Sequence, residues 1–154
     1  MSFGNITEAS AVMVEYTKST SQTVSSGDVI VFDTKRSTGS DGTSVDSSTG
    51  VISLSGARNY WVQASLAVTM STNGSYEATF QDSAGNTLSE SDGVFPAYHT
   101  ITYPDNFNNS YINHSYMGSL IVDNPTLDYK LVITAVPAGS TVLVETHLFI
   151  MELV

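Results

Sequence analysis

The sequence predicts an all-β chain folded as an antiparallel jelly-roll β-sandwich of eight to ten strands. Apolar residues recur at every second position along most of the chain, which is the spacing of a strand with one buried face. Clusters of glycine, proline, asparagine and serine separate these runs at regular intervals, and no convincing helix pattern occurs. The 154 residues are the size of one domain. We expect an N-terminal arm over residues 1–10 and a single jelly-roll domain over residues 11–154.

The first half of the domain is expected to hold five strands. The run at 28–32 has four consecutive apolar residues between turn residues, which indicates a strand buried on both faces. The run at 60–70 alternates cleanly, with Tyr60 and Val62 on one face and Trp61 on the other. The pair Asn73-Gly74 then predicts a hairpin turn. The expected strands are 11–16, 28–32, 50–54, 60–70 and 75–81.

Three more strands are expected in the second half, at 116–122, 127–136 and 141–154. The last of these is apolar on both faces, with Leu148 on one side and Phe149 and Met151 on the other. A strand of this kind is expected to be covered by the core on one side and by a neighbouring subunit on the other.

The segment 89–110 differs from the rest of the chain because it combines prolines and asparagines with aromatic residues. A loop with this many rings is a candidate contact surface. The alternative is that the rings plug one end of the barrel. The aromatic residues concerned are Phe95, Tyr98, Tyr103 and Phe107.

Composition excludes several classes of function. The formal net charge of −10 opposes binding to phosphate backbones, so no nucleic-acid partner is expected. Cysteine is absent, which rules out disulfides and thiolate chemistry. We also expect no membrane span, because no stretch approaches 18 apolar residues, and no signal peptide, because the N-terminus lacks a basic region followed by an apolar run.

The sequence offers no catalytic constellation. The histidines His99, His114 and His147 have no second ligand at metal-binding spacing, and His147 is expected to be a satisfied interface or core residue. No nucleophile elbow, phosphate loop or zinc-protease motif occurs. We therefore expect no enzyme activity.

Calcium is the one cofactor that the sequence leaves as a hypothesis, because loop carboxylates are the ligands that this ion prefers. The alternative is that these acids are scattered over a solvated surface. The candidate ligands are Asp41, Asp46, Asp92 and Asp105.

About forty residues carry a likeness to a known superfamily. A hydrophobic strand ends in Phe-Asp at 29–33 (VIVFD), and 45–50 (VDSSTG) follows a polar loop. Gly56 and the aromatic run at 60–62 (YWV) come next, and 148–153 (LFIMEL) forms a hydrophobic C-terminal strand. In these stretches the chain resembles the jelly-roll superfamily of tumour necrosis factor and the globular heads of complement proteins. It departs from the pattern at Val45, where an aromatic residue is usual.

The resemblance implies a ten-stranded jelly roll and a tight homotrimer in which strand faces form an apolar axis. The candidate residues of that interface are Tyr60, Val62, Leu148, Phe149 and Met151. The superfamily also occurs as phage virion modules, which this chain resembles in being rich in serine, threonine and glycine, acidic and free of cysteine.

By analogy with those modules, we expect a trimeric capsid decoration protein on the virion surface, with the major capsid protein as its partner. The candidate capsid contact is the N-terminal arm, at Phe3, Asn5 and Ile6, although the same segment is also typical of a disordered terminus. The alternative function is a receptor-binding knob of a phage fibre, which would use the aromatic loop. A cellular signalling ligand of the same fold is a third hypothesis, opposed by the missing signal peptide and cysteines.

Overall fold

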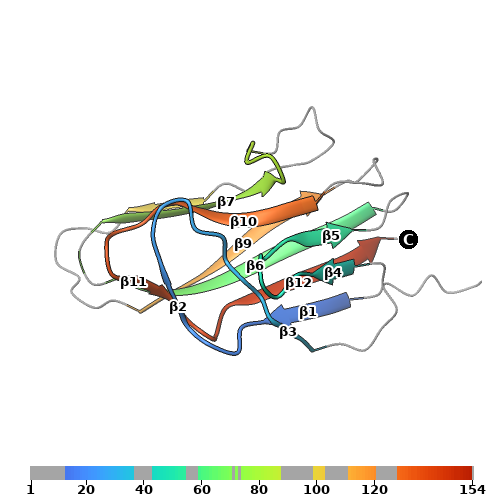
Figure 1. Cartoon of the computed structure of the whole chain (residues 1–154), viewed down its shortest axis with the longest axis horizontal. Coiled ribbons are helices and arrows are strands. Elements are labelled where there is room, and N and C mark those ends of the chain that lie inside the picture. The colour runs from blue at the N-terminus through green and yellow to red at the C-terminus, as the bar shows by residue number, and fades with distance from the viewer. Residues whose placement is uncertain are drawn as a thin grey trace, which may run out of the picture.

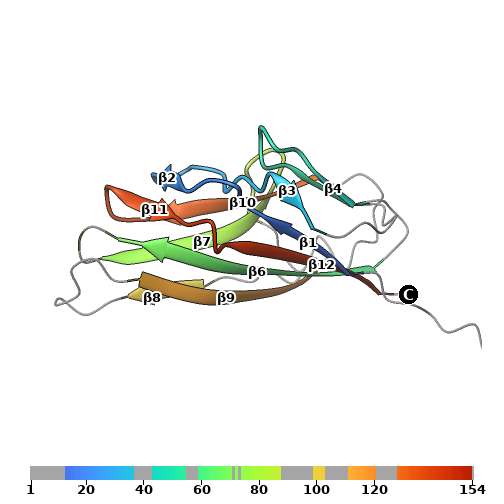
Figure 2. The same ribbon diagram turned by 90° about the horizontal axis from the view of Figure 1, so that it is seen from below.

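Two antiparallel sheets packed face to face make up the structure (Figures 1 and 2). The computed structural model describes residues 13–36, 43–54, 59–70, 72, 74–87, 99–102, 111–120 and 128–153. Within these ranges the chain forms twelve strands, seven in one sheet and five in the other. The number of described strands is higher than the eight to ten that the sequence predicted. Five of the twelve are only two or three residues long, and such short strands account for the difference.

The large sheet runs in the order β2-β11-β6-β12-β1-β3, and β9 pairs with the other edge of β6. Its strands are β1 (Met13–Thr17), β2 (Gln22–Val24), β3 (Thr34–Lys35), β6 (Asn59–Thr69), β9 (Tyr111–Leu120), β11 (Ser140–Val142) and β12 (His147–Leu153). The small sheet runs in the order β4-β5-β10-β7-β8. Its strands are β4 (Thr43–Val45), β5 (Ile52–Leu54), β7 (Ser75–Asp82), β8 (His99–Thr102) and β10 (Asp128–Ala135).

Most successive strands lie in opposite sheets. After β5 the chain passes to β6 in the large sheet, to β7 in the small one, and later from β8 to β9 and back to β10. Strands that alternate between two facing sheets give a jelly roll rather than a set of local hairpins. The predicted all-β antiparallel jelly-roll sandwich is therefore confirmed.

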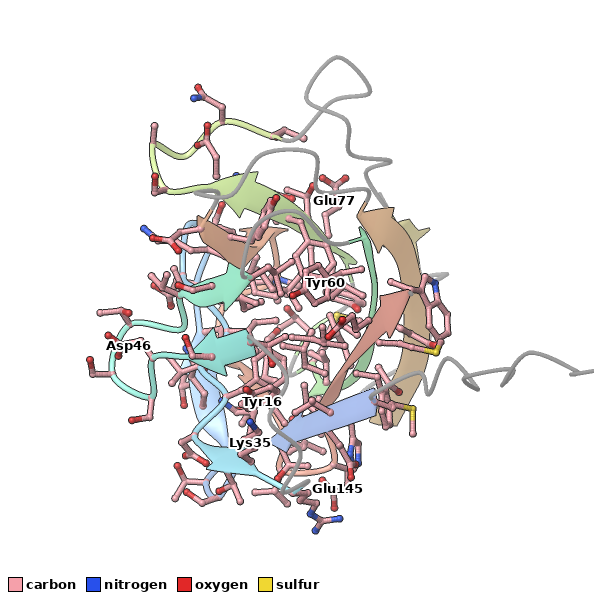
Figure 3. All side chains as sticks on the ribbon, turned by 90° about the vertical axis from the view of Figure 1, so that its right-hand side faces the viewer. Tyr16, Lys35, Asp46, Tyr60, Glu77 and Glu145 are labelled. Atoms are coloured by element: carbon pink, nitrogen blue, oxygen red, sulfur yellow. The ribbon has the colours of Figure 1, made fainter. Side chains whose placement is uncertain are left out.

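The core lies between the sheets and comes from every second residue of the long strands. Tyr60, Tyr76 and Tyr129 are the largest side chains in it, and all three are completely buried. Figure 3 shows Tyr60 between the two layers. Burial of a wholly apolar core side chain such as Phe80 stabilises the fold by about 1.5–3 kcal/mol. Because side chains alternate across a strand, the neighbours of most core residues point outward, although Ala67 and Val132 are buried beside core residues as well.

The segment 28–32 is not the strand buried on both faces that its apolar run predicted. Only Ile30 and Phe32 are buried, while Val29 and Val31 are half-buried. On one edge the segment bonds to β10, through Ile30 N to Leu131 O at 2.8 Å and a bridge between Val29 and Val132. On the other edge the side chain of Gln22 takes the place of a strand: its amide nitrogen donates to Val29 O at 2.8 Å, and its oxygen accepts from Val31 N at 3.2 Å. A glutamine can satisfy both backbone groups in this way because it carries a donor and an acceptor on one amide.

Lys18 completes this arrangement. Its Nζ donates to Val31 O at 2.6 Å and to Gln22 Oε1 at 2.9 Å. Burial of the ammonium lowers the pKa of Lys18, and the charge of Asp33 partly opposes that shift.

The last predicted strand, 141–154, is two strands separated by a turn. β11 pairs Val142 with Val68 of β6, whereas β12 resumes with His147 opposite Ser65. The chain therefore advances five residues where β6 advances three. The buried Thr146 fills the gap, because its hydroxyl accepts from Ala67 N at 3.0 Å and lies 3.3 Å from Ala67 O. A residue inserted in this way bends the strand and ends the continuous ladder.

Candidate interaction surface

The outward side of the large sheet is built from alternate residues of β1, β12 and β6. The pairing register places Met13 beside Met151, and Met151 beside Trp61. One step along the strands, Glu15 lies beside Phe149, and Phe149 beside Gln63. We refer to this surface as the outer face of the large sheet; its residues are Met13, Glu15, Trp61, Gln63, His147, Phe149 and Met151.

This outer face is rich in large apolar side chains for a surface open to solvent. Met13 is 57% exposed, and Trp61, Phe149 and Met151 are half-buried. The same rows continue onto β9, where Met117 holds the register position opposite Gln63. Methionine and aromatic residues are enriched at the centres of protein interfaces, where they are removed from water. The composition of this face is therefore that of a contact surface.

One polar pair lies among these apolar side chains. His147 Nδ1 is 2.6 Å from Glu15 Oε1, and the imidazole stacks on Phe149 with the ring centroids 5.9 Å apart and the planes 7° from parallel. The two polar side chains are 30% and 25% exposed respectively. A carboxylate oxygen accepts hydrogen bonds, so this contact is satisfied when His147 Nδ1–H is the donor. His147 therefore has a hydrogen-bond partner as expected, but it lies on the outward side of its strand rather than in the core, and its place in an interface stays a prediction.

Three of the five candidate interface residues do not lie on this face. Tyr60, Val62 and Leu148 are completely buried between the sheets and present no surface to a partner. Their assignment to a subunit interface was wrong because they belong to the inward set of their strands, which the protomer's own core covers. Phe149 and Met151 belong to the outward set, and their role in an interface stays a prediction.

The outward side of the small sheet has a different composition. Ser44 lies beside Ser53, and Ser53 beside Asp128, whose Oδ1 accepts a hydrogen bond from the Ser53 hydroxyl at 2.5 Å. Lys130 lies beside Gln81 in the next pair. A shallow hollow of about 610 Å³ lies over β4, β5 and the start of β10. It is lined by Ser44, Val45, Asp46, Ser47, Val51, Ser53 and Asp128.

Asp46, one of the candidate calcium ligands, has a structural role in the turn between β4 and β5. Its Oδ1 accepts hydrogen bonds from the Ser48 hydroxyl at 2.6 Å, from Ser48 N at 2.7 Å and from Thr49 N at 3.0 Å. These bonds lower the pKa of Asp46 to about 2, and the bond from the Ser48 hydroxyl makes the largest contribution. Figure 3 shows Asp46 at the outer rim of the molecule.

No cluster of three or more histidines and carboxylates that could hold a metal ion occurs among the residues that the structure describes. The other candidate ligands, Asp41, Asp92 and Asp105, lie outside those residues, so calcium binding by them stays a prediction.

The remaining predicted contact residues also lie outside the described ranges. These are Phe3, Asn5 and Ile6 of the N-terminal arm, and Phe95, Tyr98, Tyr103 and Phe107 of the segment 89–110. That segment was expected to be a loop, but it holds β8, which pairs with β7. A helix long and apolar enough to cross a membrane is not found in the described part of the chain.

Comparison with known proteins identifies the fold. No protein-family profile and no curated protein matches the sequence. Among solved structures, the chain is similar to the Eiger tumour necrosis factor of S. frugiperda, with a TM-score of 0.61 and 12% sequence identity over 94% of this chain and 93% of that chain. The chain therefore has a tumour-necrosis-factor-like jelly-roll fold, as the sequence resemblance predicted.

Proposed function

We propose that this chain is a non-enzymatic structural protein that assembles as a homotrimer through the outer face of the large sheet and decorates a viral capsid. The observation that carries the proposal is the row of Met13, Met151 and Trp61 beside Phe149 on a face open to solvent. Such side chains gain free energy when a partner removes them from water, at about 25 cal/mol for each Å² of apolar surface.

Charge supports a second copy of the chain as the occupant of this face. The chain carries 15 acidic and 5 basic residues, so two copies repel one another over most of their surfaces. On the outer face of the large sheet, Glu15 contacts His147. The exposed Arg36 lies across from Glu15, because its backbone N–H donates to Glu15 O, so this face is not predominantly acidic. Copies therefore approach with least repulsion through this face. The number of three protomers comes from the resemblance to the tumour necrosis factor superfamily.

The capsid role is supported by composition. An acidic, cysteine-free chain rich in serine and threonine, with a jelly-roll fold, fits a virion surface module. The mechanism is mass action: a protein that binds only the assembled shell stabilises it in proportion to RT ln(1 + [L]/Kd). Threefold symmetry lets one trimer contact several shell subunits at once, which increases avidity.

Co-sedimentation tests the capsid role. The full chain is mixed with undecorated shells of the virus that encodes it, and the heat stability of the shells is measured with and without the protein. We expect the chain to pellet with the shells and to raise their melting temperature. A variant lacking residues 1–10 is expected to remain trimeric but to stay in the supernatant. Full-length chain that stays in the supernatant would refute the capsid role.

A receptor-binding knob is the alternative, and the aromatic loop residues Phe95, Tyr98, Tyr103 and Phe107 favour it. Aromatic rings stack on the apolar faces of sugars and anchor protein contacts. Glycan-array binding that is lost on replacing Tyr98 or Tyr103 by alanine would favour this function over capsid decoration.

A further inference from the structure

We propose that a hollow between strands β3 and β4 binds a monosaccharide that carries a carboxylate, such as a uronic acid, with Lys35 as the partner of that carboxylate. The hollow has a volume of about 280 Å³ and is lined by residues of β1, β3, β4 and the segments beside them. It does not include the apolar residues of the outer face of the large sheet, so the inference is independent of the proposed self-association.

The hollow is formed by the edge strands of both sheets. β3 ends the strand order of the large sheet, and β4 ends that of the small sheet. The register places Lys35 beside the buried Tyr16, so both side chains lie on the side of the large sheet that faces the small one. The Tyr16 hydroxyl lies 3.3 Å from the hydroxyl of Thr43 and 3.4 Å from its carbonyl oxygen. Tyr16 and Thr43 both line the hollow, so this contact joins its two walls.

The deepest residues of the hollow are aromatic. Phe32 is 1% exposed and Tyr16 is 4% exposed, and both line the hollow. Sites for small molecules combine an apolar lining of this kind with a few polar groups that fix the orientation of the ligand. Their volumes begin at about 300 Å³, so this hollow suits a single ring rather than a longer ligand.

The rim of the hollow is polar and can bond to the hydroxyl groups of a sugar. Ser44 and Ser47 are exposed there, and each hydroxyl can donate and accept. Asp33, the acid among the lining residues, accepts from Ser19 N at 2.8 Å, from the Ser19 hydroxyl at 2.7 Å and from the Thr34 hydroxyl at 2.9 Å. Desolvation raises the pKa of Asp33, but these bonds outweigh it and lower the pKa below its usual value. Asp33 is therefore an ionised acceptor in a fixed position.

Lys35 is the cation among the lining residues. Its Nζ lies 5.8 Å from the centre of the Tyr16 ring, and Figure 3 shows the two side chains side by side. An ammonium has three N–H donors, so this contact with the ring is compatible with a charge-assisted hydrogen bond to a ligand carboxylate. Asp46, in the adjoining turn, lines the neighbouring hollow over β4 and β5 rather than this one.

The sequence around β3 offsets the general repulsion of anions by this acidic chain. Three of its five basic residues, Lys18, Lys35 and Arg36, lie between positions 18 and 36, together with two acids, Asp28 and Asp33. This stretch therefore carries one net positive charge, whereas the whole chain carries −10. A neutral sugar would leave Lys35 without a charged partner, and a simple carboxylate would use neither the aromatic residues nor the rim hydroxyls. A sugar acid uses all three.

Saturation-transfer NMR of the full chain with methyl glucuronide tests this inference. The method observes the ligand, so it works whether the chain is monomeric or assembled. We expect saturable binding with a dissociation constant of about 1 mM, the usual affinity of a ligand of this size. Methyl glucoside, which lacks the carboxylate, and acetate, which lacks the ring, are each expected to bind at least about tenfold more weakly.

Variants of the two neighbouring cations locate the site. Lys35→Gln is expected to weaken binding of methyl glucuronide at least about tenfold, and Lys35→Arg to keep it within about threefold. Arg36→Gln is the matched control: it removes the same charge one residue along, on the side of Glu15, and should also stay within about threefold of the unmodified chain. Both cations are exposed, so the variants are expected to fold, which thermal denaturation checks.

Three outcomes overturn the inference. The first is no saturable signal up to about 20 mM methyl glucuronide. The second is equal binding of methyl glucoside or acetate, which would reduce the site to an apolar hollow or a surface lysine. The third is an equal loss in Lys35→Gln and Arg36→Gln, which would show that only the overall charge matters. None of these outcomes bears on the proposed self-association.

Discussion

The two outward faces of the sandwich share one geometry but differ in chemistry. Both belong to antiparallel sheets whose inward residues form the same core, and both alternate residue by residue. The large sheet presents Trp61, Phe149 and Met151, whereas the small sheet presents Ser53, Asp128 and other hydrophilic side chains. The solvated face of an antiparallel sheet ordinarily carries polar residues rather than large apolar ones. This difference is the reason we propose that the large sheet, rather than the small one, meets a partner.

The division between inward and outward residues can be tested with two neighbours on β12. Replacing the buried Leu148 by alanine leaves a cavity in the core and is expected to reduce the free energy of unfolding by about 3–5 kcal/mol. Phe149→Ala is the matched variant, and it should cost the dissociated protomer less than about 1.5 kcal/mol because its ring is already partly in solvent. Urea denaturation below the association concentration measures both. Equal losses would remove the distinction between the two sides of the strand.

A charge placed on each outward face compares the two sheets directly. Met151→Glu puts a carboxylate among the apolar residues of the large sheet and is expected to weaken association by at least about 100-fold. Lys130→Glu makes a charge change on the outward side of the small sheet and should leave association within about threefold. Sedimentation velocity measures both variants. A loss in Lys130→Glu with none in Met151→Glu would place the interface on the other sheet.

Gly50 tests the turn that supports the small sheet. Its φ of +71° is in the left-handed region, and a Cβ there would lie 2.7 Å from Val29 Cγ1 and 2.8 Å from Ile30 O. Gly50→Ala is therefore expected to lower the free energy of unfolding by about 2–3 kcal/mol. Gly27 also has a positive φ but nothing within 4 Å, so Gly27→Ala should cost only about 1 kcal/mol. Thermal denaturation of both variants measures the difference, and equal losses would show that the close contact does not matter.

The smallest expected effect concerns acid stability. The pKa of Asp46 is about 2 in the folded chain and near 3.8 when unperturbed, so its ionised form stabilises the fold above pH 3.8. That contribution is lost as the pH falls through about 2. Asp46→Asn should therefore melt lower than the unmodified chain near neutral pH, and this gap should close between pH 3.8 and about 2. A gap that persists unchanged through this window would contradict the turn assignment.

The fold could be predicted from the sequence because period-two patterns and turn residues act locally. The same alternation places Leu148 and Phe149 on opposite sides, yet it does not say which side of a doubly apolar strand is the core. That choice depends on what the facing sheet supplies, and three candidate interface residues were misassigned for this reason.

Local features that depend on side-chain hydrogen bonds could not be predicted from the hydrophobic pattern of the sequence either. The apolar run at 28–32 is indistinguishable from a strand in a full ladder, because the group that replaces the backbone partner on one edge is a side chain, that of Gln22. The break before β12 depends on the hydroxyl of Thr146 meeting Ala67, a contact between residues 79 positions apart. The contact between His147 and Glu15 spans 132 positions and has no sequence signal beyond a polar residue in each apolar strand.

Light scattering coupled to size-exclusion chromatography tests the central claim most directly. At micromolar concentration, the account predicts a mass near three times the 16.4 kDa of the chain. A monomer at every concentration would mean that the outer face of the large sheet stays in solvent, and would contradict the account.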